Sequence, residues 1–270
     1  MRPNTVEKRA AFRRLHESGC FVMPNPWDVG SALMLQKLGF PALASTSAGM
    51  AWSLGRADNH VPLDDVLAHL RVLVSAVDVP VNADFEHAFA DDPEGVARNV
   101  ARAASTGVAG LSVEDSTGRA DEPLYDFGLA VERVAAARAA LDGERGGVVL
   151  TARSEGFIVG RPDIDETIRR LVAFAGAGAD CLYAPGIREP DHIRAVVEAV
   201  APKPVNGLTL GQPVAELAAL GVRRISVGGA LARVAYGAFL RAARAIAADG
   251  TFDHSQGVAS TELNGLFAGR

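Results

Sequence analysis

Short apolar runs rich in valine, isoleucine and leucine alternate along the chain with alanine-, arginine- and glutamate-rich stretches whose apolar residues recur at helical spacing. This alternation is typical of repeated βα units around a parallel sheet. Eight short runs are predicted strands: 20–25, 42–46, 79–85, 110–115, 147–154, 181–186, 203–208 and 223–229. Eight strands is the number in a closed (β/α)8 barrel of the TIM type, which is the predicted fold class.

Helical patterns fill the intervals between these runs, as in 62–77 and 164–178, where acidic residues occupy the expected first turn. Gly107, Gly178 and Gly221 each follow a helical stretch and are expected to end a helix before the next strand. A doubly wound open sheet is the rival architecture. No glycine-rich dinucleotide loop follows the first predicted strand, so the barrel is favoured.

The chain has 270 residues, is 49% hydrophobic and contains no long low-complexity linker. This predicts a single barrel domain over 1–250, including an N-terminal helix, followed by a C-terminal tail over 251–270. The last helical pattern, 229–250, has a long apolar and alanine-rich face. Small side chains on such a face permit close approach of another helix.

Charge and cysteine content narrow the class of protein. The 27 basic and 32 acidic residues give a formal charge of -5, and the basic residues are dispersed, so nucleic acid is not an expected partner. Cys20 and Cys181 lie far apart in apolar settings, which favours a reduced cytoplasmic chain without a disulfide framework or thiolate zinc site. The N-terminus is charged, and no apolar run approaches the ~20 residues of a membrane span.

Polar residues gather where the predicted strands end. In a barrel these ends meet at one mouth, where the active site lies. Each residue also has a structural interpretation, because serine and threonine form turns, Asp115 can cap a helix and Arg153 can pair with a carboxylate. Five strands contribute, which favours a common site: Ser45, Thr46 and Ser47; Asp84 and Glu86; Glu114 and Asp115; Arg153 and Glu155; Asn206.

The carboxylates of Asp84, Glu86 and Glu114 suggest a metal. Burying carboxylates costs several kcal/mol per unpaired charge, so a cation is expected among them. Hard oxygen ligands suit Mg2+ or Mn2+ better than zinc, and Mg2+ typically takes only one or two carboxylates directly. The alternative is a structural ion-pair network with Arg153.

Five segments also resemble one family, in order and in spacing. They are "STSAGMAWSLGRADN" (45–59), "PVNADFEHAF" (80–89), "GVAGLSVEDS" (107–116), "LTARSEGF" (150–157) and "LGVRRISVGGALARVAYGAF" (220–239). Over nearly its whole length the chain is similar to the isocitrate lyase and phosphoenolpyruvate mutase superfamily. The resemblance implies a barrel whose last helix packs on a neighbouring subunit, and Mg2+ holding a 2-oxo or 2-hydroxy carboxylate that is cleaved through an enolate.

The resemblance also implies roles for individual residues. The metal shell would consist of Asp84, Glu86 and Glu114, with Asp58 as a further acidic residue near the metal. Arg153 would clamp the substrate carboxylate. The substrate oxygens would be held by Ser45, Thr46 and Ser47, and Asn206 is a further candidate for substrate binding.

Two departures from the family pattern bear on the reaction. The segment 113–128 has no cysteine, lysine or histidine, although the family's lyases carry a Lys-Lys-Cys-Gly-His segment there and its mutases a lysine and an asparagine. This argues against both the isocitrate lyase and the mutase reaction. Glu86 replaces the usual second aspartate, and His87 begins a segment that replaces Thr-Gly-Tyr. His87 is a candidate for proton transfer, with a structural role as the alternative.

The predicted function is that of a Mg2+- or Mn2+-dependent lyase acting on a small 2-oxo or 2-hydroxy acid, with decarboxylation of oxaloacetate as the simplest reaction. Cleavage of a substituted malate and hydrolysis of phosphonopyruvate are alternatives. A non-catalytic 2-oxo-acid-binding protein is an alternative of another class. A homodimer or homotetramer is expected, without membrane attachment.

Overall fold

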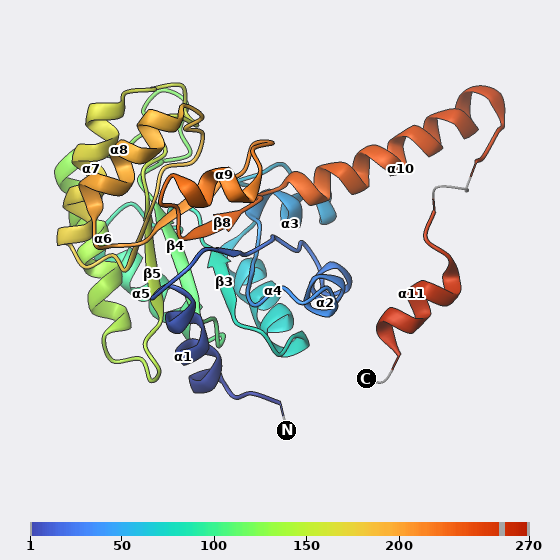
Figure 1. Ribbon diagram of the computed structural model, residues 1–270, viewed down its shortest axis with the longest axis horizontal. Helices are drawn as coiled ribbons and strands as arrows, with labels where there is room; N and C mark the ends of the chain where they lie inside the picture. The colour runs from blue at the N-terminus through green and yellow to red at the C-terminus, as the bar shows by residue number, and fades with distance from the viewer. Residues whose placement is uncertain (1, 254–256, 269–270) are drawn as a thin grey trace.

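A computed structural model describes residues 2–253 and 257–268, and it confirms all eight predicted strands (Figure 1). Each observed strand lies inside its predicted run and all are parallel neighbours in one curled sheet. The strands are β1 Phe21–Val22, β2 Leu43–Ala44, β3 Val81–Asp84, β4 Gly110–Glu114, β5 Val149–Arg153, β6 Cys181–Tyr183, β7 Val205–Leu208 and β8 Arg224–Ser226.

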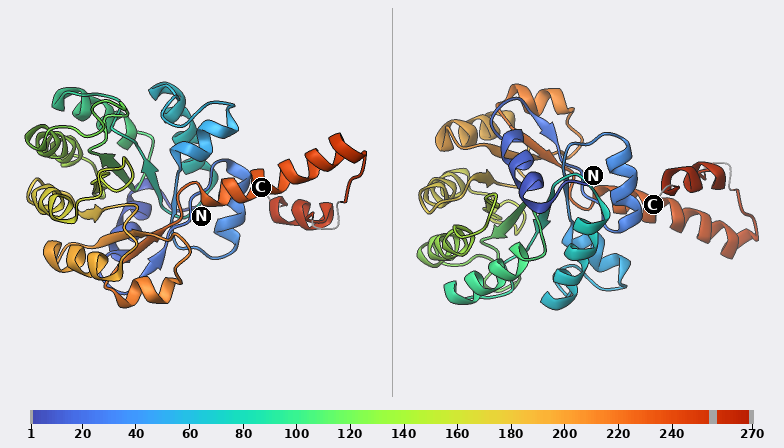
Figure 2. Two further views of the ribbon diagram at one scale, coloured as in Figure 1. Left: turned by 90° about the horizontal axis from the view of Figure 1, so that it is seen from above. Right: turned by 90° about the horizontal axis from the view of Figure 1, so that it is seen from below.

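Helices surround this sheet, as the views along its axis show (Figure 2). The positive φ angles of Gly107, Gly178 and Gly221, which are 91°, 103° and 93°, confirm that these glycines make the turns out of three helices. The helices are α1 Thr5–Leu15, α2 Val29–Lys37, α3 Ser47–Ser53, α4 Leu63–Ala76, α5 Pro93–Ala104, α6 Phe127–Leu141, α7 Ile164–Gly176, α8 Pro190–Val200, α9 Val214–Ala219, α10 Ala230–Asp249 and α11 Ser260–Phe267.

The barrel closes at a seam between β1 and β2. The strand order runs β1-β8-β7-β6-β5-β4-β3-β2, and β1 and β2 share no ladder. A backbone hydrogen bond crosses this seam, from Ala44 N to Pro24 O at 3.1 Å. Asn25 reinforces it, because its Nδ2 donates to Ser45 O and its Oδ1 accepts from Gly228 N, both at 2.9 Å. These contacts complete the predicted (β/α)8 barrel.

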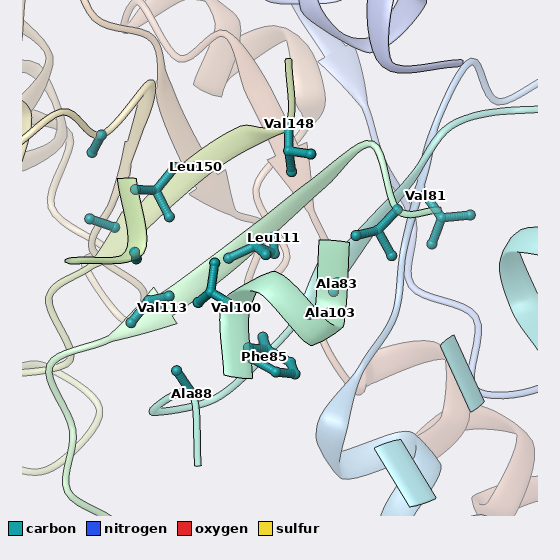
Figure 3. Close-up of a cluster of buried hydrophobic side chains, with 14 of the residues drawn as sticks. Val81, Ala83, Phe85, Ala88, Val100, Ala103, Leu111, Val113, Val148 and Leu150 are labelled. Atoms are coloured by element: carbon teal, nitrogen blue, oxygen red, sulfur yellow. The ribbon is translucent and has the colours of Figure 1, made fainter. Parts of the chain in front are cut away.

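Side chains alternate between the inside and the outside of the barrel. On β3, Val81 and Ala83 pack outward against the helices, whereas Asn82 and Asp84 face inward, as strand geometry requires. Leu111 on β4 is fully buried in the same outer layer, close to the residues of α5 (Figure 3). The outer layer is therefore apolar, and the polar half of each strand is left to line the interior.

The N-terminal helix α1 closes the end of the barrel where the strands begin. Phe12 is fully buried and packs edge-on against Phe21, with ring centroids 6.3 Å apart. It belongs to a separate core cluster with residues at or near the starts of strands, such as Ala109 and Val149. Because this end is filled, the opposite mouth is the open one.

The C-terminal part of the chain extends away from the barrel (Figures 1 and 2). The helix predicted over 229–250 is present as α10, and Ala232 is its only buried residue. Helix α11 packs beside α2, where Lys37 Nζ donates to Gly265 O at 3.0 Å. Part of the predicted tail, 254–256 and 269–270, lies outside the described residues. Among the described helices, none has the combined length and apolarity of a membrane span.

Candidate active site

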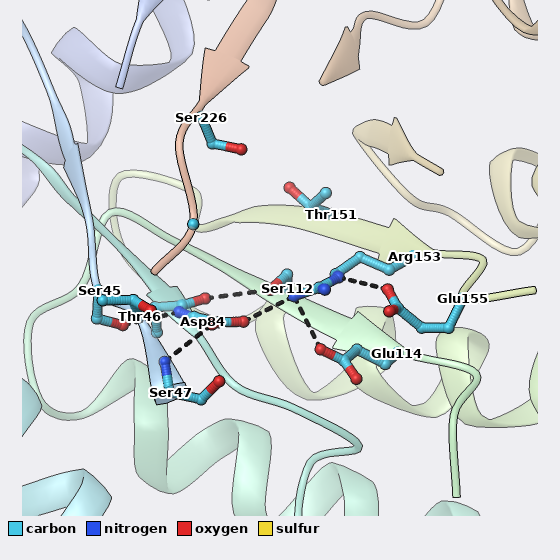
Figure 4. Close-up of polar contacts among 12 residues, drawn as sticks. Ser45, Thr46, Ser47, Asp84, Ser112, Glu114, Thr151, Arg153, Glu155 and Ser226 are labelled. Carbon is cyan, nitrogen blue, oxygen red and sulfur yellow. Dashed lines mark hydrogen bonds and ion pairs between the residues drawn. The ribbon is translucent and has the colours of Figure 1, made fainter. Parts of the chain in front are cut away.

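Arg153 is the centre of the polar cluster at the open mouth (Figure 4). Its Nη1 lies 2.7 Å from Asp84 Oδ1 and 2.8 Å from Glu114 Oε1, and its Nε lies 2.8 Å from Glu155 Oε1. Three strands, β3, β4 and β5, thus meet at one guanidinium. Nη2 makes no hydrogen bond to the described residues, so it remains available to a ligand.

The residues that end β2 hold Asp84 in place. Ser45 Oγ accepts a hydrogen bond from Asp84 N at 2.8 Å, and Ser47 N donates to Asp84 Oδ2 at 3.0 Å. Thr46 caps α3, accepting from Gly49 N at 3.3 Å. All three predicted residues line the cavity at this mouth, and the contacts of Ser45 and Ser47 orient the acid.

Asp115 positions Glu155 from below the surface. It is only 2% exposed, accepts from Glu155 N at 2.7 Å, and pairs with Arg170 Nη1 at 3.1 Å. The helix-cap interpretation of Asp115 is therefore wrong, because its carboxylate instead ties the end of β4 to the segment after β5 and to α7.

Glu86 occupies a strained and buried position. Its φ of 47° is left-handed, a conformation that costs roughly 1–3 kcal/mol for a residue with a side chain. Its Oε2 is buried without a hydrogen-bond partner, as is His69 Nε2, and both residues line one small cavity of about 10 Å³. Burial, followed by the charges of Asp84 and Asp58, raises the pKa of Glu86 to about 8.

Two neighbouring cavities open at this mouth. The inner one, of about 170 Å³, reaches into the barrel, and the outer one, of about 470 Å³, lies beneath the loop 116–123. Ser47, Asp58, Arg153 and Glu155 line both. A ligand in the inner cavity therefore contacts the acidic cluster at its rim, and the loop covers the approach.

The structure brings most of the predicted site residues together. The inner cavity is lined by Ser45, Thr46, Ser47, Asp58, Asp84, Arg153 and Asn206. Glu114 lines the outer cavity and Glu86 the small one behind Ser47. His87 lines none of these three. Its ring packs beside Phe89, with centroids 5.6 Å apart, and burial followed by the charge of Arg133 lowers its pKa.

Burial and charge act against each other at the rim. Burial raises the pKa of Glu114 and of Glu155, although the charge of Arg153 opposes both shifts. Burial alone would lower the pKa of Arg153, but the carboxylates of Glu114, Glu155 and Asp84 raise it well above its usual range. Arg153 is therefore a fixed positive charge surrounded by an excess of acid.

The donor atoms at the rim fit a hard divalent cation. Asp84, Glu86 and Glu114 offer carboxylate oxygens, and Glu86 Oε2 is a buried oxygen without a partner. Over residues 2–253 and 257–268, no three acidic, histidine or cysteine side chains are close enough to hold an ion by themselves. A fit therefore requires the mode typical of Mg2+, with one or two carboxylates and the remaining ligands from water and substrate.

Several cavity residues were missed by the sequence prediction. Tyr183, Asn82 and Ser226 line the inner cavity, and so does Arg224, which is 2% exposed. A signal for Arg224 exists in "RRISVGG", because the alternation that sends Ile225 outward places the arginine inside. The sequence has two adjacent arginines here, Arg223 and Arg224, and only the structure shows that the buried strand begins at the second.

The fold and the site define a class: a (β/α)8 enzyme with an acidic, arginine-centred site at the carboxyl ends of its strands. The chain belongs to the phosphoenolpyruvate phosphomutase family, whose sequence model matches residues 12–247. It thus belongs to the isocitrate lyase and phosphoenolpyruvate mutase superfamily, which confirms the resemblance seen in the sequence.

Similar proteins extend this picture. An uncharacterized protein of Mycobacterium tuberculosis (strain ATCC 25618 / H37Rv) is 32% identical, covering 87% of this chain and 88% of its own. Oxaloacetate decarboxylase of Paraburkholderia xenovorans (strain LB400) is 30% identical, covering 73% of this chain and 67% of its own.

Two crystal structures share the fold. One, a lyase/mutase candidate from Burkholderia cenocepacia J2315, has a TM-score of 0.94 and 49% identity, with 98% of this chain and 97% of that chain covered. The other, phosphonopyruvate hydrolase in complex with oxalate and Mg2+, has a TM-score of 0.84 and 25% identity, with 96% of this chain and 94% of that chain covered.

Proposed function

We propose that this chain cleaves a carbon–carbon bond of a small 2-oxo acid through an enolate, with Mg2+ or Mn2+, and that decarboxylation of oxaloacetate is its reaction. The observation that carries the proposal is the acidic cluster around Arg153 at the rim of a cavity of about 170 Å³. The oxaloacetate decarboxylase and the Mg2+-containing hydrolase among the similar proteins support it.

The rim residues have separate roles in holding the cation and the substrate. Asp84, Glu86 and Glu114 would hold the cation, directly or through water, with Asp58 near it. A bound cation would supply Lewis-acid stabilisation of the negative charge that develops on the substrate. Arg153 donates from Nη2 to the substrate carboxylate and fixes its orientation, because a guanidinium keeps its charge and its planar geometry.

The loop 116–123 has a covering role in this reaction. Its side chains include no histidine, lysine or cysteine, and the enolate product can take its proton from water. Thr117 N donates to Pro123 O at 3.0 Å, so the two ends of the loop are tied together above the outer cavity. A cover of this kind shields the cleavage step from bulk water.

The proposal is tested by following the loss of oxaloacetate with purified protein. We expect decay above the protein-free rate with Mg2+ or Mn2+, loss of that decay with EDTA, and recovery when the metal is restored. Saturable binding of oxaloacetate without accelerated decay would instead identify a 2-oxo-acid-binding protein. Turnover of phosphonopyruvate or of a substituted malate, but not of oxaloacetate, would contradict the decarboxylase assignment.

We also propose that the protein is a homodimer or homotetramer assembled through α10. Val234, Phe239 and Ile246 on this helix are 69%, 65% and 49% exposed, an apolar surface that a second copy of the chain can cover. Exchange of α10 between subunits would bury it. Light scattering should give at least twice the mass of the chain, and a stable monomer at micromolar concentration would contradict this assembly.

A further inference from the structure

We propose that Arg224 forms an anion-binding subsite at the floor of the inner cavity and receives a second negatively charged group at the far end of the ligand. The subsite itself rests on the surroundings of Arg224. Only the identity of the ligand, a 2-oxo acid with two anionic ends, rests on the proposed function.

The position of Arg224 is the first step. It begins β8, is 2% exposed, and lines the inner cavity that Arg153 also lines. Register pairs join Arg153 to Tyr183, Tyr183 to Asn206 and Asn206 to Arg224 across neighbouring strands. Because barrel strands tilt by about 36° and lie ~4.8 Å apart, three such steps move roughly 8 Å along the axis. Contact with His16, the residue that follows α1, shows that Arg224 lies on the deeper side.

The partners of Arg224 are all neutral. Its Nε donates to Asn206 Oδ1 at 2.7 Å, its Nη2 donates to Thr151 Oγ1 at 2.9 Å, and its Nη1 lies 3.3 Å from His16 Nε2. Among the ion pairs found in residues 2–253 and 257–268, none involves Arg224. Its positive charge therefore has hydrogen bonds but no counter-charge.

His16 does not supply the missing charge. Its Nδ1 lies 2.8 Å from Phe12 O, so Nδ1 carries the proton, and Nε2 is left to accept from Arg224. Burial, followed by the charge of Arg224, lowers the pKa of His16 to about 3, so the ring is neutral at physiological pH.

Other buried arginines show how a guanidinium is normally compensated. Arg9 pairs with Glu144 and Arg170 with Asp115. Arg133 has no carboxylate partner either, but it donates to three backbone carbonyl oxygens and lies over the ring of Tyr125, 3.8 Å from its centroid, away from the inner cavity. Such a charge is expensive to bury alone. Arg224 combines the missing counter-charge with access to a cavity.

The cavity wall near Arg224 can bind anionic oxygens. Ser112 and Ser226 line the inner cavity, and a serine hydroxyl can donate a hydrogen bond to an anionic oxygen. A ligand with one carboxylate can satisfy only one end of this cavity. A ligand with a second carboxylate or a phosphonate can reach both Arg153 and Arg224.

The subsite is tested by calorimetry with Mg2+ and three probes: pyruvate, 3,3-difluorooxaloacetate and phosphonopyruvate. Pyruvate carries one anionic group, and the other two carry a second one, as carboxylate or phosphonate. Arg224→Gln removes the charge and keeps amide donors. In this variant, the affinity for at least one of the two larger probes should fall at least tenfold more than the affinity for pyruvate does. Arg224→Lys, which keeps the charge, should retain the preference within about threefold. Arg133→Gln serves as a control, since it alters a buried arginine away from the inner cavity.

An unchanged preference in Arg224→Gln, or an equal loss for pyruvate, would overturn the subsite. If that variant does not fold, the wild-type protein gives the same test, because 2-oxosuccinamate replaces the distal carboxylate of oxaloacetate with a neutral amide. It should bind at least tenfold more weakly than the dicarboxylate, and equal affinity would overturn the subsite. If the protein binds ligands with two anionic groups more tightly but does not turn over oxaloacetate, the proposed reaction is wrong and the subsite is still supported.

Discussion

The rim and the floor of the inner cavity each contain a buried arginine, in opposite electrostatic surroundings. At the rim, Arg153 has three carboxylate partners within 2.8 Å. At the floor, the partners of Arg224 among the described residues are all neutral. The rim therefore has more carboxyl groups than guanidinium groups and favours a cation, whereas the floor carries a positive charge without a carboxylate partner and favours an anion. Charge compensation around a guanidinium, more than the guanidinium itself, therefore determines what the site attracts.

The largest effect is expected from reducing the negative charge of the rim. Asp84→Asn keeps the shape of the side chain, yet it removes one of the proposed metal-binding oxygens. Metal-dependent turnover should fall by at least about a hundredfold, and calorimetry should show weaker Mg2+ binding. Thermal stability should change little, because strand-end carboxylates serve function more than packing.

Asp191→Asn is the matched control for that variant. Asp191 lies exposed on α8 and pairs only with Arg194, so its loss should leave Mg2+ affinity unchanged. Unchanged Mg2+ affinity in Asp84→Asn would contradict the assignment of Asp84 as a metal ligand. It would also contradict the expectation that the rim attracts a cation. Asp58→Ala should weaken the affinity less than Asp84→Asn, because we place Asp58 near the metal through water.

A second test alters the geometry of the rim and keeps its charge. Arg153→Lys cannot hold Asp84, Glu114 and Glu155 and at the same time present a planar N–H group to a ligand carboxylate. Binding of a 2-oxo acid should weaken by about 1.5–3 kcal/mol, the value of a charge-assisted hydrogen bond. Calorimetry with pyruvate measures this change. Wild-type affinity in the variant would show that Arg153 does not hold the substrate carboxylate.

The third test concerns the floor and uses pH. The pKa of His16 is about 3 in the folded chain, against an ordinary value of 6.5. Between these values the unfolded chain binds a proton that the folded chain does not, so the free energy of unfolding falls as pH drops from 6.5 toward 3. His16→Gln should lose less stability over this interval in urea titrations. The exposed His60→Gln variant should follow the wild type, and identical pH profiles for all three proteins would contradict a neutral His16.

The smallest effect is expected at the loop above both regions. Glu122 is 71% exposed and pairs with Arg119 at 3.3 Å, so Glu122→Gln leaves rim and floor intact. Turnover of oxaloacetate should change by less than about threefold, because the loop covers the site and supplies no proton in this mechanism. Near-complete loss of turnover would show that the loop carries a catalytic acid.

The sequence predicted the strands well because each apolar run is short and bounded by turn residues. It also placed Asp84, Glu114 and Arg153 at one mouth, because the alternation of side chains holds to the end of β3, β4 and β5. The direction of His87 could not be predicted in this way. The backbone turns left-handed at Glu86, with a φ of 47°, and the alternation stops one residue before the histidine.

The surroundings of Arg224 at the floor were beyond the reach of the sequence pattern. The alternation around Ile225 indicates that this arginine faces inward, but its role depends on which neutral groups surround it in space. Its partners come from β5, from β7 and from the residue that follows α1, and the distances in sequence to Thr151 and His16 are 73 and 208 residues. No local pattern encodes contacts of that separation.

The seam between β1 and β2 has a consequence for how the chain folds. β1 is anchored in the sheet through β8, where Phe21 is in register with Arg224, and joining segments so distant carries a large loop-closure entropy. During synthesis, β1 therefore waits for nearly the whole chain to emerge before it gains its neighbour. Because Arg224 begins that late strand, barrel closure and formation of the cavity floor take place in the same folding event, and a truncated chain lacking β8 would lose both together.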